Sequence, residues 1–373
     1  MSPLEELQRL LRPAGGGLHL VSTGRAEQLA LQRRLYRAAR DEEVEARWRE
    51  ALDRVAGARA VLLGVPSDVG AGYLRGSNVG PRAIRERLLE ERPDWPERAA
   101  AAGVVDLGDV FVVPQLLDDE MLSAAQLERT RRALYPDLPD EVRAGLPVSP
   151  LSIAERALRR VLELNPRAAV LALGGDHSCA WPVVRALAGA RPDLGVVQVD
   201  AHTDLLEERL GVRYCYATWS WHANELLGRG GRLVQVGVRA SARPKAHWES
   251  FGVRQLWAAE VNADPAAALD GVVARLRAAG VRQVYLSNDV DGTDAAEVDA
   301  TGTPEPDGLP SGFVVELIRR LGREFPLCGG DVMEVAPPLA RTPEGARRTV
   351  GLAVRYLEET LAAALGDEPG ERK

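Results

Sequence analysis

Acidic and imidazole side chains gather in three short segments of this sequence. The segments read LALGGDHS, VVQVDAHTD and VYLSNDVDGTD, and they supply two histidines and six carboxylates: Asp176, His177, Asp200, His202, Asp204, Asp289, Asp291 and Asp294. Without cations, these carboxylates would repel one another and carry a large desolvation cost. Oxygen ligands with a little imidazole suit Mn, and also Fe, Co, Ni or Zn. The segments therefore predict a metal centre.

The spacing within two of these segments predicts more than one ion. Asp289 and Asp291 are two residues apart, and so are Asp200, His202 and Asp204 in turn. If the chain stays extended, side chains at this spacing point to the same side, because strand side chains repeat with period two. Two such rows can hold two ions between them, and two ions about 3.5–4 Å apart hold a hydroxide at neutral pH. The pattern predicts a hydrolytic centre.

Each segment also has a simpler interpretation when it is taken alone. A lone Asp-x-Asp is typical of a turn, a lone histidine is typical of a satisfied polar residue, and GGDHS is typical of a strand-to-helix turn. All three segments follow apolar runs of one chain. Their joint occurrence favours the metal centre.

The elements that must position these residues alternate along the chain. Short apolar runs without polar alternation occur in AVLLGVPS, GVVDLGDV, AVLALGG, LGVVQVD, RLVQVGVR, QVYLSNDVD and LCGGDVMEV, with helical stretches between them. Strands of this kind are buried on both faces. Their alternation with helices predicts an α/β fold with three α/β/α layers and a mostly parallel central sheet. Ligand sites of such sheets lie at the carboxyl ends of strands, where the three segments fall.

The chain divides into three predicted parts. Residues 1–57 are rich in Arg, Glu, Ala and Leu at helical spacing and predict an N-terminal helical extension packed on the main domain. Residues 58–366 form the predicted catalytic domain, and residues 367–373 form a polar C-terminal tail. Within the domain, residues 113–150 are polar and interrupted by proline, which predicts a surface excursion with one helix.

Composition excludes several classes of function. The net charge of -7 argues against a surface for nucleic acid or anionic membranes. The three cysteines, Cys179, Cys215 and Cys328, are too few and scattered for a disulfide framework. No apolar run approaches a membrane span, and the N-terminus lacks the apolar core of a signal peptide. We expect a cytoplasmic protein that contacts neither membrane nor nucleic acid.

GGDHS, DAHTD and SNDVDGTD resemble the three metal-binding motifs of the ureohydrolases, the arginase and agmatinase family. The resemblance covers most of the chain from about Ala58 to Leu365. The stretch GVPSDVGAGYLRGSNVGPRAIRE, which contains Asn78, resembles the family's N-terminal strand and substrate-side loop. GTPEPDGL and GGDVMEVAPPL resemble two later motifs. The resemblance implies an arginase-like fold and a homo-oligomer, since family members are commonly trimers or hexamers.

The resemblance also implies roles for individual residues. One ion would be held by His177, Asp200, Asp204 and Asp289, and the second by Asp200, His202, Asp289 and Asp291. Asp204 would in addition orient a metal-bridging hydroxide, which attacks a guanidinium carbon and releases urea and an amine. Glu334 would grip the guanidinium, because a carboxylate suits that planar cationic fork. Asp176 and Ser178 are expected to support turns, and Asp294 to be structural.

The loop after DAHTD departs from the family pattern. The family carries a catalytic-loop histidine there, often in a His-Gly pair, but this chain has Tyr214, Cys215 and Tyr216. Three hypotheses follow: His222 substitutes for the missing histidine, Cys215 occupies its position, or the enzyme has no such proton shuttle. The position of His222 is equally typical of an ordinary histidine at the start of a helix. Two interpretations are open for Trp219 and Trp221: their rings form a cation–π wall around a guanidinium, or they pack in the core of the loop. Asn78 and Glu334 complete the candidate substrate-binding residues.

The loop also bears on the substrate. The family's arginase-type loop, which binds an α-carboxylate and an α-amine, is not recognisable after DAHTD, so agmatine is the default substrate. The extension and the aromatic loop resemble the divergent branch that includes guanidine hydrolases, and a guanidinoalkanoate is a further alternative. We expect a small cationic guanidino substrate and two divalent ions, Mn or alternatively Ni. A formimidoylglutamase, a non-catalytic homologue and a deacetylase-like amidohydrolase are the remaining hypotheses.

Overall fold

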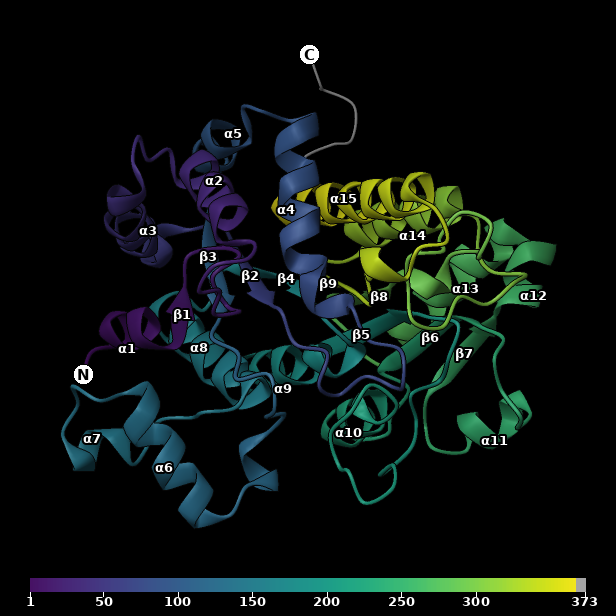
Figure 1. Cartoon of the computed structure of the whole chain (residues 1–373). Coiled ribbons are helices and arrows are strands. Elements are labelled where there is room, and N and C mark those ends of the chain that lie inside the picture. Colours follow the sequence, from purple (N-terminus) through teal and green to yellow (C-terminus); the bar gives the residue numbers. More distant parts are fainter. Residues whose placement is uncertain (367–373) are drawn as a thin grey trace.

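A single mixed sheet forms the centre of the molecule (Figure 1). The computed structural model describes residues 1–366, so the predicted tail at 367–373 lies outside the described residues. Within them the sheet has nine strands in the order β1-β3-β2-β4-β9-β8-β5-β6-β7. Every neighbouring pair is parallel except β1 with β3. The strands are β1 (Leu11–Arg12), β2 (Ala60–Val65), β3 (Val104–Val110), β4 (Ala169–Gly174), β5 (Leu194–Val199), β6 (Leu233–Val238), β7 (Arg254–Trp257), β8 (Gln283–Asp289) and β9 (Leu327–Met333).

Helices cover both faces of this sheet, which confirms the predicted three-layer α/β/α architecture (Figure 1). One layer contains α4 (Gly80–Glu91), α13 (Pro265–Ala278), α14 (Ser311–Glu324) and α15 (Pro343–Leu365). The opposite layer contains α8 (Pro150–Leu164), α9 (Ala180–Ala190) and α10 (Trp219–Leu226). Further helices lie at the periphery: α5 (Trp95–Ala101), α6 (Ala124–Leu134), α7 (Asp140–Arg143), α11 (Lys245–Glu249) and α12 (Ala258–Ala263).

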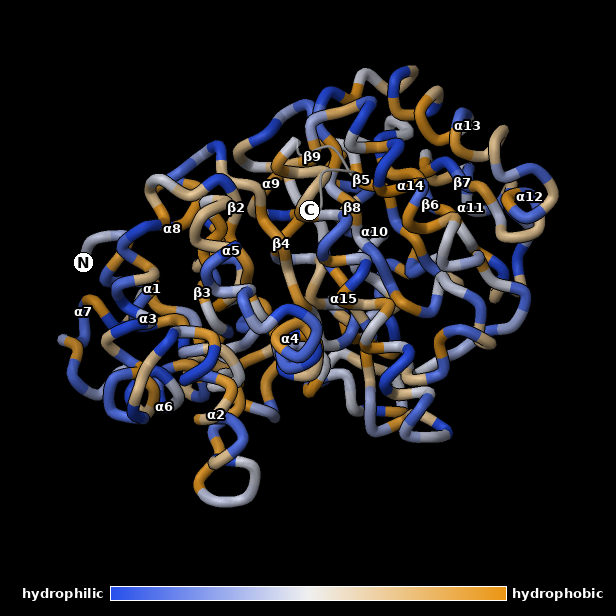
Figure 2. The backbone as a smooth tube through the Cα atoms, turned by 90° about the horizontal axis from the view of Figure 1, so that it is seen from above, coloured by the Kyte–Doolittle hydropathy of each residue, from blue (hydrophilic) through white to orange (hydrophobic). Residues whose placement is uncertain are grey.

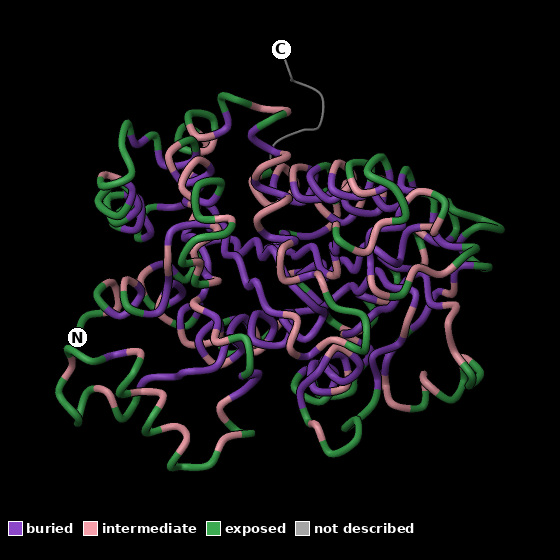
Figure 3. Tube along the Cα trace, in the orientation of Figure 1, coloured by how far each residue is buried: buried purple, intermediate pink, exposed green. Residues whose placement is uncertain are grey.

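Burial follows the apolar runs of the sequence. All residues of β2, β4, β5, β6 and β9 are buried, and Figure 3 shows the sheet as the buried centre of the molecule. Figure 2 shows the helices changing between hydrophobic and hydrophilic colours along their length, as expected for helices with one face on the sheet. The ionisable residues of the three ligand segments lie at or just beyond the ends of β4, β5 and β8.

The N-terminal segment is built into the edge of the sheet. It contains α1 (Pro3–Leu10), α2 (Arg25–Tyr36) and α3 (Val44–Leu52), and its β1 pairs with β3. Trp48 is fully buried and donates a hydrogen bond to the Leu107 carbonyl, 2.9 Å away. The Gly15 amide donates to Asp109 Oδ2 at 2.7 Å. The segment therefore shares the core of the sheet instead of resting on its surface.

Three features of the fold differ from the sequence-based description. Strands β1 and β7 were not predicted, and the excursion at 113–150 carries the short helix α7 besides α6. β1 has only two residues and β7 has an exposed first residue, so neither shows the continuous apolar run of a central strand.

In residues 1–366, no helix has both the length and the apolar composition that crossing a bilayer requires.

Candidate metal centre

The same local turn follows three of the central strands. Asp176 Oδ1 accepts a hydrogen bond from the Ser178 amide, and Asp289 Oδ1 accepts one from the Asp291 amide, both at 2.9 Å. Asp200 Oδ1 accepts from the His202 amide at 2.7 Å. Aspartate side chains form such turns with the amide two residues ahead. The turn ends each strand and directs the following side chain toward the same end of the sheet.

This geometry corrects the period-two argument. β5 ends at Val199, and Asp204 lies in the left-handed region with φ 50°. β8 ends at Asp289, and Val290–Gly292 form a 3-10 turn. The chain is therefore not extended through either ligand segment. Hydrogen-bonded turns, and not strand alternation, bring the ligands together.

His177 lies at the centre of the first ligand cluster. Its Nδ1 is 3.0 Å from Asp289 Oδ2, 3.1 Å from Asp200 Oδ2 and 3.5 Å from Asp204 Oδ2. The His177 side chain is 1% exposed, and its Nδ1 has no hydrogen-bond partner among the described residues. Three carboxylate oxygens thus converge on one buried nitrogen.

A hydrogen-bond relay fixes the tautomer of His177. The Ser287 hydroxyl donates to Asp331 Oδ1 at 3.0 Å, so it accepts from His177 Nε2–H at 2.9 Å. Asp331 also accepts from the Tyr285 hydroxyl and the Asn288 amide. His177 Nδ1 is then left with a lone pair that faces the carboxylates. Partners of this kind orient metal-binding histidines.

The second cluster surrounds His202. Its Nδ1 lies 3.2 Å from Asp291 Oδ2 and 3.4 Å from Asp200 Oδ1. Asp291 is fixed by the Ala201 amide at Oδ1 and by the Thr303 hydroxyl at Oδ2. Asp200 belongs to both clusters, through Oδ2 in the first and Oδ1 in the second. The structure thus brings all six predicted ligands together: His177, Asp200, His202, Asp204, Asp289 and Asp291.

The pKa values of His177, Asp204 and Asp289 are raised when no cation is bound. These groups then keep protons where a cation would otherwise balance the carboxylate charges. Burial works to lower the pKa of His177, but the close carboxylates of Asp200 and Asp289 outweigh burial and raise that pKa. Burial and the charge of Asp200 raise the pKa of Asp204 well above its usual value. Burial, with Asp291 and Asp200, does the same to the pKa of Asp289.

The donor set fits two divalent cations. Asp200, Asp204, Asp289 and Asp291 carry four negative charges when ionised, which two dications balance. Oxygen-rich sites with imidazole suit Mn and its neighbours. A cation would also give the partnerless lone pair of His177 the ligand that the protein does not provide.

Glu334 lies beside this centre, at the end of β9. Its Oε1 accepts a hydrogen bond from the His177 amide at 2.9 Å, and Oε2 accepts none from the described residues. Its backbone has φ 61°, so Asp204 and Glu334 are two of the six residues other than glycine with positive φ in residues 1–366. Burial and the charges of Asp289 and Asp176 raise the pKa of Glu334. Strained backbone of this kind is typical of functional positions.

Trp219 contacts two of the predicted metal ligands directly. Its ring stacks on the His177 ring with centroids 4.5 Å apart, and its indole Nε1 donates to Asp204 Oδ2 at 3.0 Å. The side chain is fully buried. Trp219 therefore holds two of the predicted ligands in place. Neither sequence-based interpretation, a cation–π wall for the substrate or packing of the loop, included this role.

The structure does not bring the other loop candidates to the cluster. His222 packs between Trp181 and Tyr214, and its Nε2 lies 3.0 Å from the Arg213 carbonyl oxygen. Trp221 packs edge-on against Phe251, and its ring lies under the Arg229 guanidinium. His222 and Trp221 line a separate surface cavity. Asn78, in the turn before α4, is half-buried.

Residues that support the ligands were also missed at the sequence level. Ser287 and Asp331 orient His177, and Gln198 donates to Asp200 Oδ2 at 2.7 Å. A signal was present for Gln198 and Asp331, because each is the one polar residue of a fully buried strand. Ser287 lies in β8 among several other polar residues and gave no such signal. Buried polar groups are normally hydrogen-bonded, so a partner was to be expected for each.

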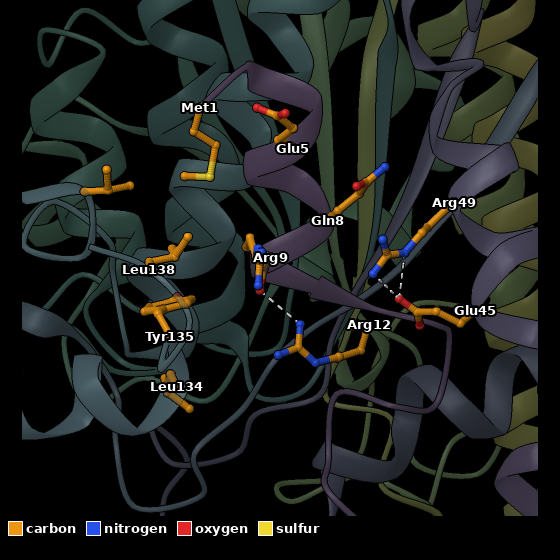
Figure 4. A pocket seen from close by; sticks show the side chains of 11 residues that line it. Met1, Glu5, Gln8, Arg9, Arg12, Glu45, Arg49, Leu134, Tyr135 and Leu138 are labelled. Carbon is orange, nitrogen blue, oxygen red and sulfur yellow. Dashed lines mark hydrogen bonds and ion pairs between the residues drawn. The ribbon is translucent and has the colours of Figure 1, made fainter. Parts of the chain in front are cut away.

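A large cavity elsewhere in the molecule is distinct from this centre. It has a volume of about 540 Å³ and lies between α1, α3 and the excursion helices (Figure 4). Arg9, Arg12 and Arg49 enter it together with Glu45, and Leu134 and Leu138 provide an apolar side. None of the six ligands lines it. This cavity is therefore no part of the candidate metal centre.

Comparison with known proteins agrees with the fold and the motifs. The sequence model described as "Arginase family" matches residues 58–362. An N(1)-aminopropylagmatine ureohydrolase of Thermus thermophilus is 34% identical over 281 residues, 75% of this chain and 83% of that protein. A guanidinobutyrase of Pseudomonas aeruginosa is 32% identical, over 76% of this chain and 80% of that protein. The solved proclavaminate amidino hydrolase of Streptomyces clavuligerus superimposes with a TM-score of 0.63 at 28% identity, covering 83% of this chain and 93% of that one.

The fold, the ligand motifs and these relatives define a ureohydrolase, an enzyme that hydrolyses carbon–nitrogen bonds of linear amidines. The chain belongs to the arginase family, as the resemblance of its motifs predicted. Members of this family generally depend on two metal ions, and the His/Asp clusters of this chain have the corresponding composition.

Proposed function

We propose that this enzyme hydrolyses a guanidino compound to urea and an amine, with two divalent metal ions held at the six-ligand centre. The observation that carries the proposal is the convergence of three buried carboxylates on the lone pair of His177 Nδ1. The relatives support the substrate class, because they are named for aminopropylagmatine and guanidinobutyrate.

The chemistry balances with water as the only co-substrate. A carbon–oxygen bond forms at the guanidinium carbon and the bond from that carbon to the substituted nitrogen breaks. Both protons of the water end on the leaving nitrogen, which departs as an ammonium ion and leaves neutral urea. Two divalent ions, when bound, supply Lewis acidity and a water of lowered pKa.

The residues of the chain supply binding and orientation. Glu334 Oε2 is positioned to accept hydrogen bonds from the guanidinium, since Oε1 is already occupied by the His177 amide. Asp204, which is held at Oδ2 by Trp219, would orient the attacking water, as the family resemblance implies. We propose Mn as the resident metal, with Ni as the alternative, because the donor set is rich in oxygen.

Urea release from a substrate panel tests this proposal. The enzyme is stripped of metal, reloaded with Mn or Ni, and given agmatine, arginine, guanidinobutyrate, guanidinopropionate, formiminoglutamate and guanidine. For formiminoglutamate the product measured is formamide instead of urea. We expect urea from at least one guanidino compound, and only after metal is restored. Absence of urea from every compound with both metals would refute the proposal. The homo-oligomer implied by the resemblance stays a prediction, for which light scattering is the measurement.

A further inference from the structure

A second cavity lies at the carboxyl end of the sheet. It has a volume of about 510 Å³ and lies between the loop after β2, the segment after β3 and the loop after β5. Its lining is mainly apolar and includes Leu116, Leu117, Met121 and Val212. Cys215 and Tyr216 form one wall. Apolar cavities of this size with one or two polar groups are typical of small-molecule sites.

Hydrogen bonds connect this cavity to the metal centre. The Tyr216 amide donates to the Gly70 carbonyl at 3.1 Å, and the Gly70 amide donates to Asp176 Oδ2 at 3.0 Å. Asp176 immediately precedes the ligand His177 in the chain. The wall of the cavity is therefore tied to the turn that presents the first ligand.

The loop after β2 extends from this cavity toward Glu334. A Cβ at Gly72 would lie 3.4 Å from the Tyr216 hydroxyl oxygen, at the cavity wall. Leu74, farther along the same loop, approaches Gly302 of a later segment. A Cβ built at Gly302 would lie 3.8 Å from the Leu74 carbonyl oxygen and 4.0 Å from Glu334 Oε2. When Glu334 binds the guanidinium of a substrate, the tail of that substrate therefore lies beside this loop and extends toward the cavity.

The cavity contains one charged residue among the described residues that line it, Arg209. The Arg209 guanidinium lies 5.3 Å above the centre of the Tyr216 ring. No carboxylate in residues 1–366 forms an ion pair with it. Glu207 and Glu208, its neighbours in sequence, line the separate cavity around His222. The charge of Arg209 is thus available to a ligand.

The rim of the cavity is also unusual, because it exposes large apolar side chains. Tyr73 is 92% exposed, Leu210 is 96% exposed and Met121 is 48% exposed. All three line the cavity. Exposed apolar groups around a concave site mark a binding surface. The surface calls for a ligand with an apolar body and a negative charge that reaches Arg209.

We propose that the substrate is a guanidino acid, with an apolar tail that ends in a carboxylate, and that Arg209 selects this tail. The inference rests on the proposed ureohydrolase function and names the substrate class of that site. Arg209 attracts a terminal carboxylate and repels the terminal ammonium of agmatine. Among the substrates that the sequence left open, the inference favours the guanidinoalkanoates over agmatine.

Three compounds with the same tetramethylene chain test this inference: guanidinopentanoate, pentylguanidine and agmatine. They end in a carboxylate, a methyl group and an ammonium. For the metal-loaded wild-type enzyme we expect kcat/KM to fall in that order, with up to about fivefold between the acid and the neutral compound, as for one exposed ion pair. R209Q should remove this difference mainly through KM, and R209E should favour agmatine over the acid.

Arg213 supplies the matched control. It lies in the same loop, is exposed, and pairs with Glu120 at 3.0 Å without lining the cavity. R213Q should keep the wild-type order of the three compounds. Equal kcat/KM for acid and amine in wild type and R209Q, with urea still released, would overturn the inference and leave the ureohydrolase function standing. No urea from any of the three compounds or from the wider panel would refute both.

Discussion

Replacing Trp219 by phenylalanine isolates one hydrogen bond of the metal centre. Phenylalanine keeps a ring that can stack on His177 but removes the indole N–H that holds Asp204 Oδ2 at 3.0 Å. A hydrogen bond to a charged acceptor contributes about 1.5–3 kcal/mol. Loss of residues that orient metal ligands typically costs about 10–100-fold in metal affinity or activity. We expect W219F to lose about 10–100-fold in kcat/KM.

The position of the loss is as informative as its size. Asp204 contacts the first cluster, around His177, and His202 forms the second with Asp291 and Asp200. Calorimetric titration of metal-free W219F should therefore show one weakened ion and one ion bound nearly as in the wild type. Urea release at saturating metal should recover part of the lost activity, because added metal refills the weakened site.

Trp221 provides a control of the same chemistry on the same helix. Its ring packs against Phe251 and contacts none of the six ligands. W221F should keep wild-type metal affinity and activity, and thermal melting should show both variants folded. If W219F matches W221F in metal affinity and kcat/KM, the role assigned to the indole N–H is wrong.

Four further results are expected. D289N removes a carboxylate that contacts His177 and should abolish turnover and lower the metal content below two ions per chain, measured by elemental analysis; near-normal rates would contradict the shared-ligand assignment. S287A removes the acceptor that fixes the His177 tautomer and should weaken metal binding about tenfold in titrations, whereas unchanged affinity would exclude the relay. Metal removal should lower the melting temperature by about 7 °C if each ion is present at about 100 times its Kd. The raised pKa of His177 stabilises the metal-free protein below pH 6.5, and this stability should be lost as pH rises above 6.5 in calorimetric melts without metal; a flat profile would show that His177 does not retain its proton.

The positions of the ligands were predictable from the sequence because parallel strands place their carboxyl ends at one edge. That rule brought Asp200, Asp289 and His177 together without knowledge of any distance. The way in which the side chains are presented was not predictable from strand period. Asp204 adopts a positive φ and Asp291 follows a capped turn, and both depend on hydrogen bonds formed after the strand has ended.

Features that depend on tertiary contacts were beyond the sequence. β1 pairs with β3 across about a hundred residues of chain, and its two residues carry no strand pattern of their own. The contact of Trp219 with His177 and Asp204 likewise requires the loop after β5 to fold back over the sheet. An aromatic cluster in a sequence therefore indicates burial, whereas its partner must come from the structure.

The loop after β5 carries the residues of two proposed roles, ligand support and tail binding, at different places along its length. Its inner end, at Asp204 and Trp219, contacts the metal ligands, whereas Arg209 lies at its exposed turn, with its guanidinium above Tyr216. Arg209 and Trp219 share no direct partner, and changes at sites without shared partners add within about 0.3–0.5 kcal/mol. The Leu206–Ala217 and Trp221–Asp204 backbone hydrogen bonds hold the inner end, so a change of the Arg209 side chain alone leaves the contact of Asp204 with Trp219 in place.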